Sequence, residues 1–443
     1  MQKKSAHVVD VDMGYGHARA AYALRDLAGG EVISANSYKG IPAKDKQLWQ
    51  QGRQIYETIS RLKPIPLVGD LAFEIMDQFQ EIPPFYPRRD LSKPSLQLRG
   101  IYRLIHKGQG QDLIERLRLE PLPLLTTFFT VAFMADYFGY PGEIYLVTTD
   151  ADIARHWAPF DPKNSKIKYF AANGRCAERL KLYGVRERNI VLTGFPLPKD
   201  LVGGYPEKTL QVDLMARICN LDPQGVFLSR YEKVLEARLG KAMVRCAKTP
   251  NHPLTVTFSV GGAGAQKKLG IDIMRSLKGR IRQHQIRLAL FGGLHGPVIS
   301  YFVDAAKSMD LGRELGKSLL IPTFDSRAAY FQGFNDFLHQ TDVLITKPSE
   351  LSFYTALGLP IVAAPPIGSQ ENFNKIWLQY VGGGVPMMDP RYIDEWLFDW
   401  VDSGGLARMA WSGYVEAPTH GTYRIEDIVM GRKSEIHALP LIV

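Results

Sequence analysis

The chain has 443 residues, of which 45% are hydrophobic, and its formal net charge is +9. That hydrophobic share is ordinary for a globular protein, and the length suggests two or three domains. No apolar run reaches the roughly 18–20 residues that a membrane-spanning helix needs, and no nucleic-acid-binding signature accompanies the positive charge.

The cysteines and the N-terminus point to a cytosolic setting. Cys176, Cys219 and Cys246 are odd in number and lack the spacing of metal ligands, which favours a reducing compartment. The first residues enter an expected strand too soon to form a signal peptide.

Apolar strand-like runs alternate with helical patterns in the first part of the chain. This alternation predicts a parallel sheet with helices on both faces. The stretch 194–198 ends this set, and the Gly- and Pro-rich stretch 203–206 is typical of a linker. The expected strands are His7–Val11, Glu31–Ala35, Leu124–Phe128, Ile144–Val147, Lys168–Ala171 and Ile190–Leu192.

A second set of the same kind follows a charged, helical stretch over residues 210–249. A tail helix is expected after Asp389, because apolar residues recur at helical spacing from Ile393 to Val401. The expected strands of this second set are Leu254–Val260, Arg287–Phe291, Leu319–Pro322, Val343–Ile345 and Ile361–Ala364.

Residues 341–374 carry the strongest functional signal. They are expected to form a strand, a polar turn, a helix that ends at Gly358, a second strand and a polar loop. Ligands bind at the carboxyl ends of strands in open α/β sheets. The turn 347–350 would begin the helix, where free N–H groups attract anions, and the loop 368–374 carries acceptors suited to sugar hydroxyls.

These motifs, with three others in the same order, resemble a group of glycosyltransferases with the GT-B fold. The group includes monogalactosyldiacylglycerol synthases, diacylglycerol glucosyltransferases and the lipid II N-acetylglucosaminyltransferase. Four motifs in order are a far more specific signal than any one of them. The segments are TDVLITKP (341–348) with ALGLPIV (356–362) and GSQENFN (368–374), DMGYGH (12–17), TTD (148–150) with His156-Trp157, and VGGAG (260–264).

The resemblance implies an α/β GT-B fold, with two Rossmann-like domains whose parallel sheets face a central cleft. It implies an acceptor-binding domain over 1–202, a linker and helical elaboration over 203–249, a donor-binding domain over 250–388, and C-terminal helices over 389–443 that return to the first domain. The implied activity is transfer of a sugar from a UDP-linked donor to a lipid or lipid-linked acceptor, with inversion. No metal and no cofactor beyond the UDP-sugar co-substrate are expected.

The same resemblance assigns roles to individual residues. His17 would be the base, because a neutral imidazole can accept a proton from a hydroxyl, and Asp150 and His156 would lie beside it. A structural role for His17, tight packing at the Gly-rich turn, and simple packing of His156 on Trp157 remain the alternatives. The acceptor loop would be Gly14, Tyr15 and Gly16. The donor would contact Gly261, Gly262, Gly264, Phe324, Lys347, Ser349, Glu350, Gln370, Glu371 and Asn374.

One position departs from the family pattern. The relatives carry a ribose-binding glutamate five residues before the glycine of GLP, where this chain has Phe353. Glu350 lies three residues earlier, one helical turn back on the same face, and is the candidate replacement. The departure keeps two alternatives open: a sugar-nucleotide epimerase of the same fold, and a catalytically silent protein that binds a nucleotide sugar.

The positive charge is uneven. Residues 86–118 hold eight Lys and Arg against three Asp and Glu, next to apolar, proline-rich loops at 62–69 and 82–86. Such a segment indicates either a solvated basic face or a surface that docks on anionic lipid. A surface that docks on anionic lipid, together with the expected lipid acceptor, predicts a cytoplasmic protein that is peripheral on the inner face of the membrane.

Overall fold

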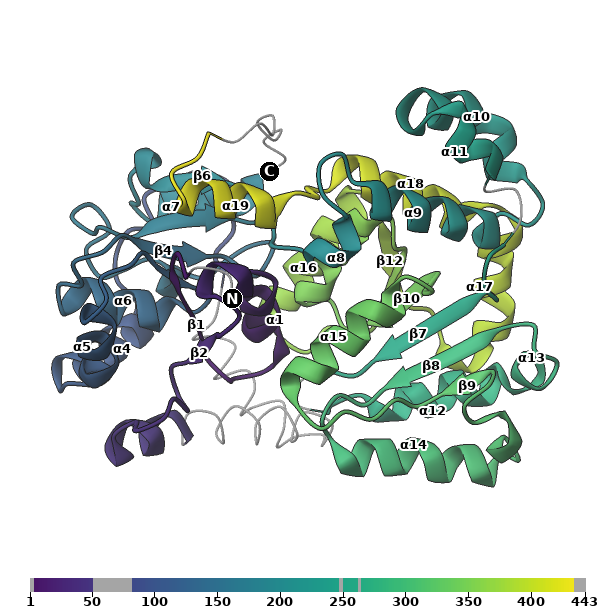
Figure 1. Ribbon diagram of the computed structural model, residues 1–443, viewed down its shortest axis with the longest axis horizontal. Coiled ribbons are helices and arrows are strands. Elements are labelled where there is room, and N and C mark those ends of the chain that lie inside the picture. The colour runs from purple at the N-terminus through teal and green to yellow at the C-terminus, as the bar shows by residue number, and fades with distance from the viewer. Residues whose placement is uncertain (1–3, 51–81, 247–249, 262–263, 434–443) are drawn as a thin grey trace. The chain divides into compact units, whose positions relative to one another are not determined.

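A computed structural model of the protein describes residues 4–50, 82–246, 250–261 and 264–433 (Figure 1). The chain divides into two compact units. Unit 1 comprises 1–198, 367–374 and 420–443, and unit 2 comprises 199–366 and 375–419. Each unit holds one six-stranded sheet among the described residues, and every strand pairing is parallel. The predicted fold class, α/β with two Rossmann-like parallel sheets, is therefore confirmed.

The sheet of unit 1 has the strand order β2-β1-β3-β4-β5-β6. Its inner strands β1, β3, β4 and β5 are buried almost throughout, as expected for a sheet covered on both faces, and the edge strands β2 and β6 are half-buried. The strands are β1 (His7–Asp10), β2 (Ile33–Ser34), β3 (Leu124–Thr126), β4 (Ile144–Val147), β5 (Lys168–Ala171) and β6 (Ile190–Leu192). The helical segments are α1 (Tyr15–Ala23), η1 (Arg25–Ala28), α4 (Leu96–His106), α5 (Gln111–Arg118), α6 (Phe129–Tyr137), η2 (Arg155–Trp157), α7 (Gly174–Leu182), η3 (Glu187–Asn189) and α19 (Gly421–Val429).

Two apolar clusters cover the opposite faces of this sheet. Val9 of β1 packs in the cluster that includes residues of α4, α5, α6 and α7, and its neighbour Val8 packs in the cluster with residues of η1 and α19. Successive strand residues point to opposite faces, so one strand supplies both clusters. The helix that closes the second face is α19, through Ile425 and Val429.

The sheet of unit 2 has the order β12-β11-β10-β7-β8-β9. Its strands are β7 (Thr255–Ser259), β8 (Arg287–Phe291), β9 (Leu319–Leu320), β10 (Val343–Thr346), β11 (Ile361–Ala363) and β12 (Gly384–Pro386). Its helical segments are α8 (Lys199–Val202), α9 (Lys208–Leu221), α10 (Val226–Leu239), α11 (Lys241–Cys246), α12 (Lys267–Ser276), α13 (Lys278–Arg282), α14 (Gly296–Ser308), η4 (Gly312–Glu314), α15 (Arg327–Leu338), η5 (Glu350–Leu357), η6 (Pro390–Tyr392), α17 (Ile393–Asp402) and α18 (Gly405–Glu416). Helix α16 (Ser369–Tyr380) begins in the 367–374 segment of unit 1 and continues in unit 2.

These units group the chain differently from the expected domains. The helical stretch after residue 203 belongs to unit 2, where α9 contacts α18. The tail helix α17 also belongs to unit 2, while the short segment 367–374 and α19 belong to unit 1. The expected boundaries followed runs of sequence, whereas the compact units join segments that are far apart in the chain.

Both sheets contain a point where the strand order changes direction. In unit 1 the chain moves outward in opposite senses from the neighbours β1 and β3, and in unit 2 from the neighbours β7 and β10. Ligands of doubly wound folds bind at the carboxyl ends of such neighbouring strands. Each unit therefore has one position where a ligand site is expected on topology alone.

Candidate functional site

His17 lies at the switch point of unit 1. It follows β1 on the first turns of α1, which begins after Gly14, and Gly14 has φ 110°, a backbone conformation that favours glycine. The imidazole Nδ1 lies 2.7 Å from the carbonyl oxygen of Thr127, just beyond the end of β3. The hydroxyl of Thr127 in turn donates to the carbonyl oxygen of His17 at 2.9 Å. The two neighbouring strand ends are thus tied together through these residues.

The hydrogen bond to Thr127 determines the tautomer of His17. A carbonyl oxygen only accepts, so Nδ1 carries the proton and Nε2 is the basic nitrogen. Thr149 places its hydroxyl 3.3 Å from the same Nδ1, and the ring of Phe128 meets the imidazole edge-on at 4.9 Å. The ring is therefore oriented from several sides, as a proton acceptor requires.

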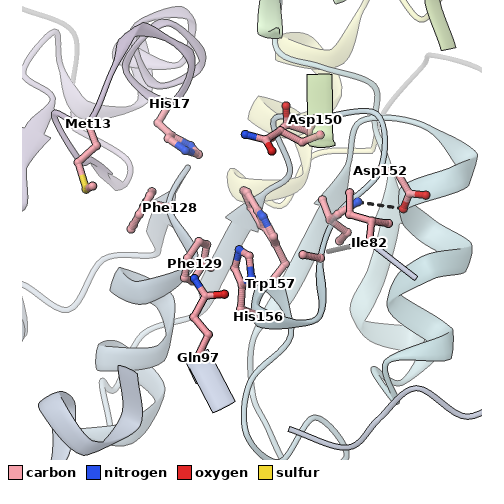
Figure 2. A pocket seen from close by; sticks show the side chains of 13 residues that line it. Met13, His17, Ile82, Gln97, Phe128, Phe129, Asp150, Asp152, His156 and Trp157 are labelled. Carbon is pink, nitrogen blue, oxygen red and sulfur yellow. Dashed lines mark hydrogen bonds between the residues drawn. The ribbon is translucent and has the colours of Figure 1, made fainter. Parts of the chain in front are cut away.

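A pocket of about 240 Å³ opens beside His17, entirely within unit 1 (Figure 2). Asp150 and His156, the two residues predicted to accompany His17, both line it. Because His17, Phe128 and Asp150 follow the ends of β1, β3 and β4, the parallel sheet brings these segments, which are far apart in sequence, to one edge. The lining residues are Met13, His17, Ile82, Gln97, Phe128, Phe129, Asp150, Asp152, Ile153, Ala154, His156, Trp157 and Gln370.

Asp150 is held in place by Asn374, which belongs to the 367–374 segment of unit 1. The amide nitrogen of Asn374 donates to the Asp150 carboxylate at 2.8 Å, and its amide oxygen accepts from the backbone N–H of Ala151 at 2.6 Å. Asn374 is fully buried. Its amide thus positions Asp150, a role that its place in the motif did not suggest.

His156 is buried, and its ring lies 4.8 Å from that of Phe129. Burial, reinforced by the nearby charge of Arg155, lowers the pKa of His156 from 6.5 to about 4. The imidazole is therefore neutral at physiological pH, able to accept or donate a hydrogen bond but without positive charge.

The neighbouring Asp152 is an ionic anchor rather than a reactive group. It is 1% exposed, and it pairs with Arg179 at 2.8 Å and with Arg175 at 2.9 Å. The ring of Phe85 lies 4.0 Å from the Arg175 guanidinium. This cluster fixes one wall of the pocket and explains why Phe85, in the loop expected to be an exposed apolar surface, is buried.

The candidate donor residues of unit 2 gather at its own switch point. Gly261 follows β7 and Lys347 follows β10, and a Cβ placed on Gly261 would lie 2.6 Å from Cε of Lys347. The lysine side chain thus runs against a backbone that carries no side chain of its own. Gly264 has φ +66°, and Gly262 lies outside the described residues.

The turn after Lys347 is tight and lies at the expected residues. The N–H of Ser349 donates to the carbonyl oxygen of Lys347 at 2.9 Å, and Glu350 begins a 3₁₀ helix rather than an α-helix. This helix ends at Gly358 with φ 63°, as the sequence predicts. Glu350 is 7% exposed.

Phe353, which stands where the glycosyltransferases that this sequence resembles carry a glutamate, is part of the core. It is 2% exposed, and its ring lies 4.8 Å from that of Trp377. Phe324, another candidate donor contact, stacks on Phe291 at the end of β8 with ring centroids 6.2 Å apart. The side chain at position 353 thus makes an apolar packing contact and supplies no carboxylate.

Three residues predicted to contact the donor lie in unit 1. Gln370 lines the pocket beside His17, and Asn374 holds Asp150. The Glu371 carboxylate accepts from the backbone N–H of Ile367 at 2.7 Å and is 3% exposed. The predicted set is therefore divided, with Gly261, Gly264, Phe324, Lys347, Ser349 and Glu350 in unit 2.

Sequence reasoning missed most of the pocket wall. Gln97, Phe128 and Phe129 were not singled out, although Phe128 and Phe129 directly follow the expected strand at 124–128. Their position at a strand end beside the switch point was the available signal. Gln97 carried none, because it belongs to a helix whose place in the fold the sequence does not give.

A larger cavity, about 940 Å³, lies elsewhere in unit 2. It is lined by residues such as Asn220, His252 and Leu254, which precede β7 or end α9, so it is at the amino-terminal edge of the sheet. No predicted site residue lines it. Among the described residues, no group of three His, Cys, Asp or Glu is arranged to hold a metal ion.

Comparison with known proteins finds no matching family model and no matching curated protein. Among solved structures, UDP-GlcNAc 2-epimerase from Neisseria meningitidis bound to UDP-GlcNAc is similar at 11% identity and TM-score 0.47, over 97% of this chain and 100% of that chain. MurG from Acinetobacter baumannii is similar at 13% identity and TM-score 0.47, over 97% and 100%. Because these TM-scores are below 0.5, the fold assignment rests on the strand orders described above.

Proposed function

We propose that the chain is a GT-B glycosyltransferase that transfers a sugar from a UDP-linked donor to a lipid or lipid-linked acceptor. The observation that carries the proposal is His17: an oriented imidazole at a sheet switch point, lining a pocket with Asp150. In this proposal the acceptor hydroxyl enters the unit 1 pocket and gives its proton to Nε2 of His17. The hydroxyl oxygen attacks the anomeric carbon, the bond to the diphosphate breaks, and configuration inverts.

The donor is proposed to bind at the switch point of unit 2. Lys347 supplies a positive charge there, and Gly261 leaves its backbone accessible. Backbone N–H groups and a cation can stabilise a departing diphosphate without a metal. Metal independence is part of the proposal on this ground.

A direct binding experiment tests the donor half of the proposal. Calorimetry in the presence of EDTA should show that UDP and at least one UDP-sugar bind the full chain. Lys347→Met should weaken this binding about tenfold or more, because a charge-assisted hydrogen bond is lost. Lys268→Met, which removes an exposed lysine of α12, is the matched control. If no nucleotide diphosphate sugar binds, the proposal is refuted.

A second candidate function, a silent nucleotide-sugar-binding protein, is favoured by one observation. Phe353 is buried against Trp377, so the family carboxylate at that position is absent. Proton NMR of the same donor panel distinguishes the outcomes. Transfer or hydrolysis supports the transferase, a change of configuration within the intact nucleotide sugar supports the epimerase, and binding without any reaction supports the silent protein.

The site of action is proposed to be the cytoplasmic face of a membrane. Among the described residues, no helix is long and apolar enough to cross one. The outward face of α4, with the residue that caps its C-terminal end, combines apolar and basic side chains that are all exposed: Leu96, Arg99, Arg103, Leu104 and the cap Lys107. We call these five residues the α4 face.

A further inference from the structure

The walls of the unit 1 pocket are aromatic. Phe128 and Phe129 stack with ring centroids 4.7 Å apart, and Trp157 lies 5.3 Å from Phe129 and 6.0 Å from His17. Aromatic faces carry negative charge density and attract the polarised C–H groups of a ligand. Such walls suit a ring with an apolar face more than a bare ionic group.

One polar group in the wall lacks a partner. Gln97, on the first turn of α4, lines the pocket, and its amide oxygen is buried with no hydrogen bond among the described residues. Figure 2 shows the amide beside Phe129 and His156. A buried acceptor without a donor is costly, so a ligand hydroxyl that donates to it would be favoured.

The charges at the pocket disfavour an anion. None of the described lining residues is lysine or arginine, whereas the Asp150 carboxylate lines the pocket. Arg155, close in sequence, is committed elsewhere: its guanidinium donates to the carbonyl oxygens of Ser92, Ala158 and Pro159.

The two arginines of α7 are also committed, since Arg175 and Arg179 both pair with Asp152. His156 adds no charge, because its lowered pKa keeps the ring neutral. A phosphate in this pocket would lose its hydration without gaining a cation, which is strongly unfavourable.

We propose that the unit 1 pocket binds an uncharged polyol such as a sugar ring, with one hydroxyl donating to the Gln97 amide oxygen and the ring packed on Phe129 and Trp157. This inference rests on the proposed function in one respect: the polyol is the part of the acceptor that reacts. Gln97 is then a specificity-determining residue, since it selects a hydrogen-bond donor and its surroundings exclude an anion.

The test compares two probes with the same tail. Binding of n-octyl glucoside and of n-octyl phosphate to the full chain is measured by calorimetry below their micelle concentrations, without nucleotide. The glucoside should bind at least tenfold more tightly than the phosphate. Gln97→Met, which keeps the length of the side chain, should weaken glucoside binding about tenfold. The same substitution at the exposed Gln111 is the matched control and should change nothing.

A second variant distinguishes loss of the hydrogen-bond acceptor from misfolding of the protein. Gln97→Glu keeps an oxygen acceptor at the same place, so glucoside binding should persist while phosphate binding weakens further. The inference is overturned if the phosphate binds as tightly as the glucoside, if Gln97→Met leaves glucoside binding unchanged, or if the glucoside does not bind.

Because no nucleotide is present, the result is independent of the donor experiment. Glucoside binding without donor binding would refute the transferase and leave the polyol site standing. Donor binding without glucoside binding would refute the polyol site alone.

Discussion

His17 is the residue on which the proposed chemistry depends. Its hydrogen bond to Thr127 fixes the tautomer, and its place beside the pocket fixes the direction from which a hydroxyl can approach. The motif singled out this residue, and its role as a base stays a prediction; the sequence contained no sign of Thr127, which lies 110 positions away. A hydrogen-bond partner that is brought close by strand pairing cannot be predicted until the strand order is known.

We expect His17→Ala to lower turnover roughly 10²-fold or more and to leave donor affinity nearly unchanged, because general-base catalysis contributes on that scale. Steady-state rates and calorimetry with UDP measure the two quantities. Thr149→Val removes only the long 3.3 Å contact and should alter turnover little. An equal loss of donor binding in His17→Ala would instead give the histidine a structural role.

A second prediction at this scale concerns the pH dependence of stability. The pKa of His156 is about 4 in the folded protein and near 6.5 when unfolded. Between these values the unfolded chain takes up a proton that the folded chain does not, so the free energy of unfolding falls as pH drops from about 6.5 toward 4. Between pH 7 and pH 5 the loss is about 2 kcal/mol.

Urea unfolding of the wild type and of His156→Gln at pH 7 and pH 5 measures this difference. The variant should lose less stability than the wild type over that interval. His7, whose pKa burial also lowers, contributes equally to both proteins and cancels in the comparison. Parallel losses in the two proteins would contradict the assignment.

At the scale of elements, strands were predicted more reliably than their surroundings. Four of the predicted strands, at 144–147, 168–171, 190–192 and 287–291, agree with the structure at both ends. Buried parallel strands are short apolar runs, which a sequence displays directly. β12 was missed, because it has only three residues, and Gly384 and Pro386, which are both depleted in strands, flank the single β-branched residue Val385.

Helix α9 shows what sequence cannot reveal at this scale. Arg217 is 1% exposed and its guanidinium donates to the carbonyl oxygens of Thr341, Leu357 and Leu338 at 2.7, 2.6 and 2.7 Å. The charged stretch predicted as an elaboration thus contains a core residue of unit 2. A basic residue in a charged helix is ordinarily expected to be exposed to solvent, so the sequence pattern predicted an exposed Arg217.

Arg217→Met should lower the free energy of unfolding by about 3 kcal/mol or more, because three buried carbonyl groups lose charged donors. Urea denaturation monitored by circular dichroism measures the change. Arg230→Met, at an exposed position on α10, should change stability by less than about 0.5 kcal/mol. Similar midpoints for the two variants would show that the buried guanidinium is dispensable.

At the scale of the whole molecule, the structure shows that part of the basic segment expected to bind a membrane is not available for binding. Arg116 binds the Asp112 carboxylate and the carbonyl oxygens of Lys39 and Gly40, and Arg118 binds that of Phe138. Ile82 and Phe85 are buried, and the loop at 62–69 lies outside the described residues. The α4 face stays exposed: Leu96 is 77% and Leu104 38% exposed beside three cations.

The α4 face should bind anionic vesicles at low salt and release them partly as salt rises. Each cation near an anionic surface contributes about 1 kcal/mol, and this attraction is screened by salt. The two leucines add apolar insertion energy that salt does not screen, so release should be incomplete. Neutral vesicles should bind the protein weakly.

Vesicle sedimentation with charge-reversed and apolar variants separates the two contributions. Arg99→Glu with Arg103→Glu should abolish binding at low salt, whereas Leu96→Ser with Leu104→Ser should leave low-salt binding but make it fully salt-reversible. Lys233→Glu with Arg238→Glu, at exposed positions on α10 in unit 2, is the control for a change in net charge alone. If the wild type does not sediment with anionic vesicles at low salt, the α4 face is a solvated surface and the acceptor reaches the pocket from solution.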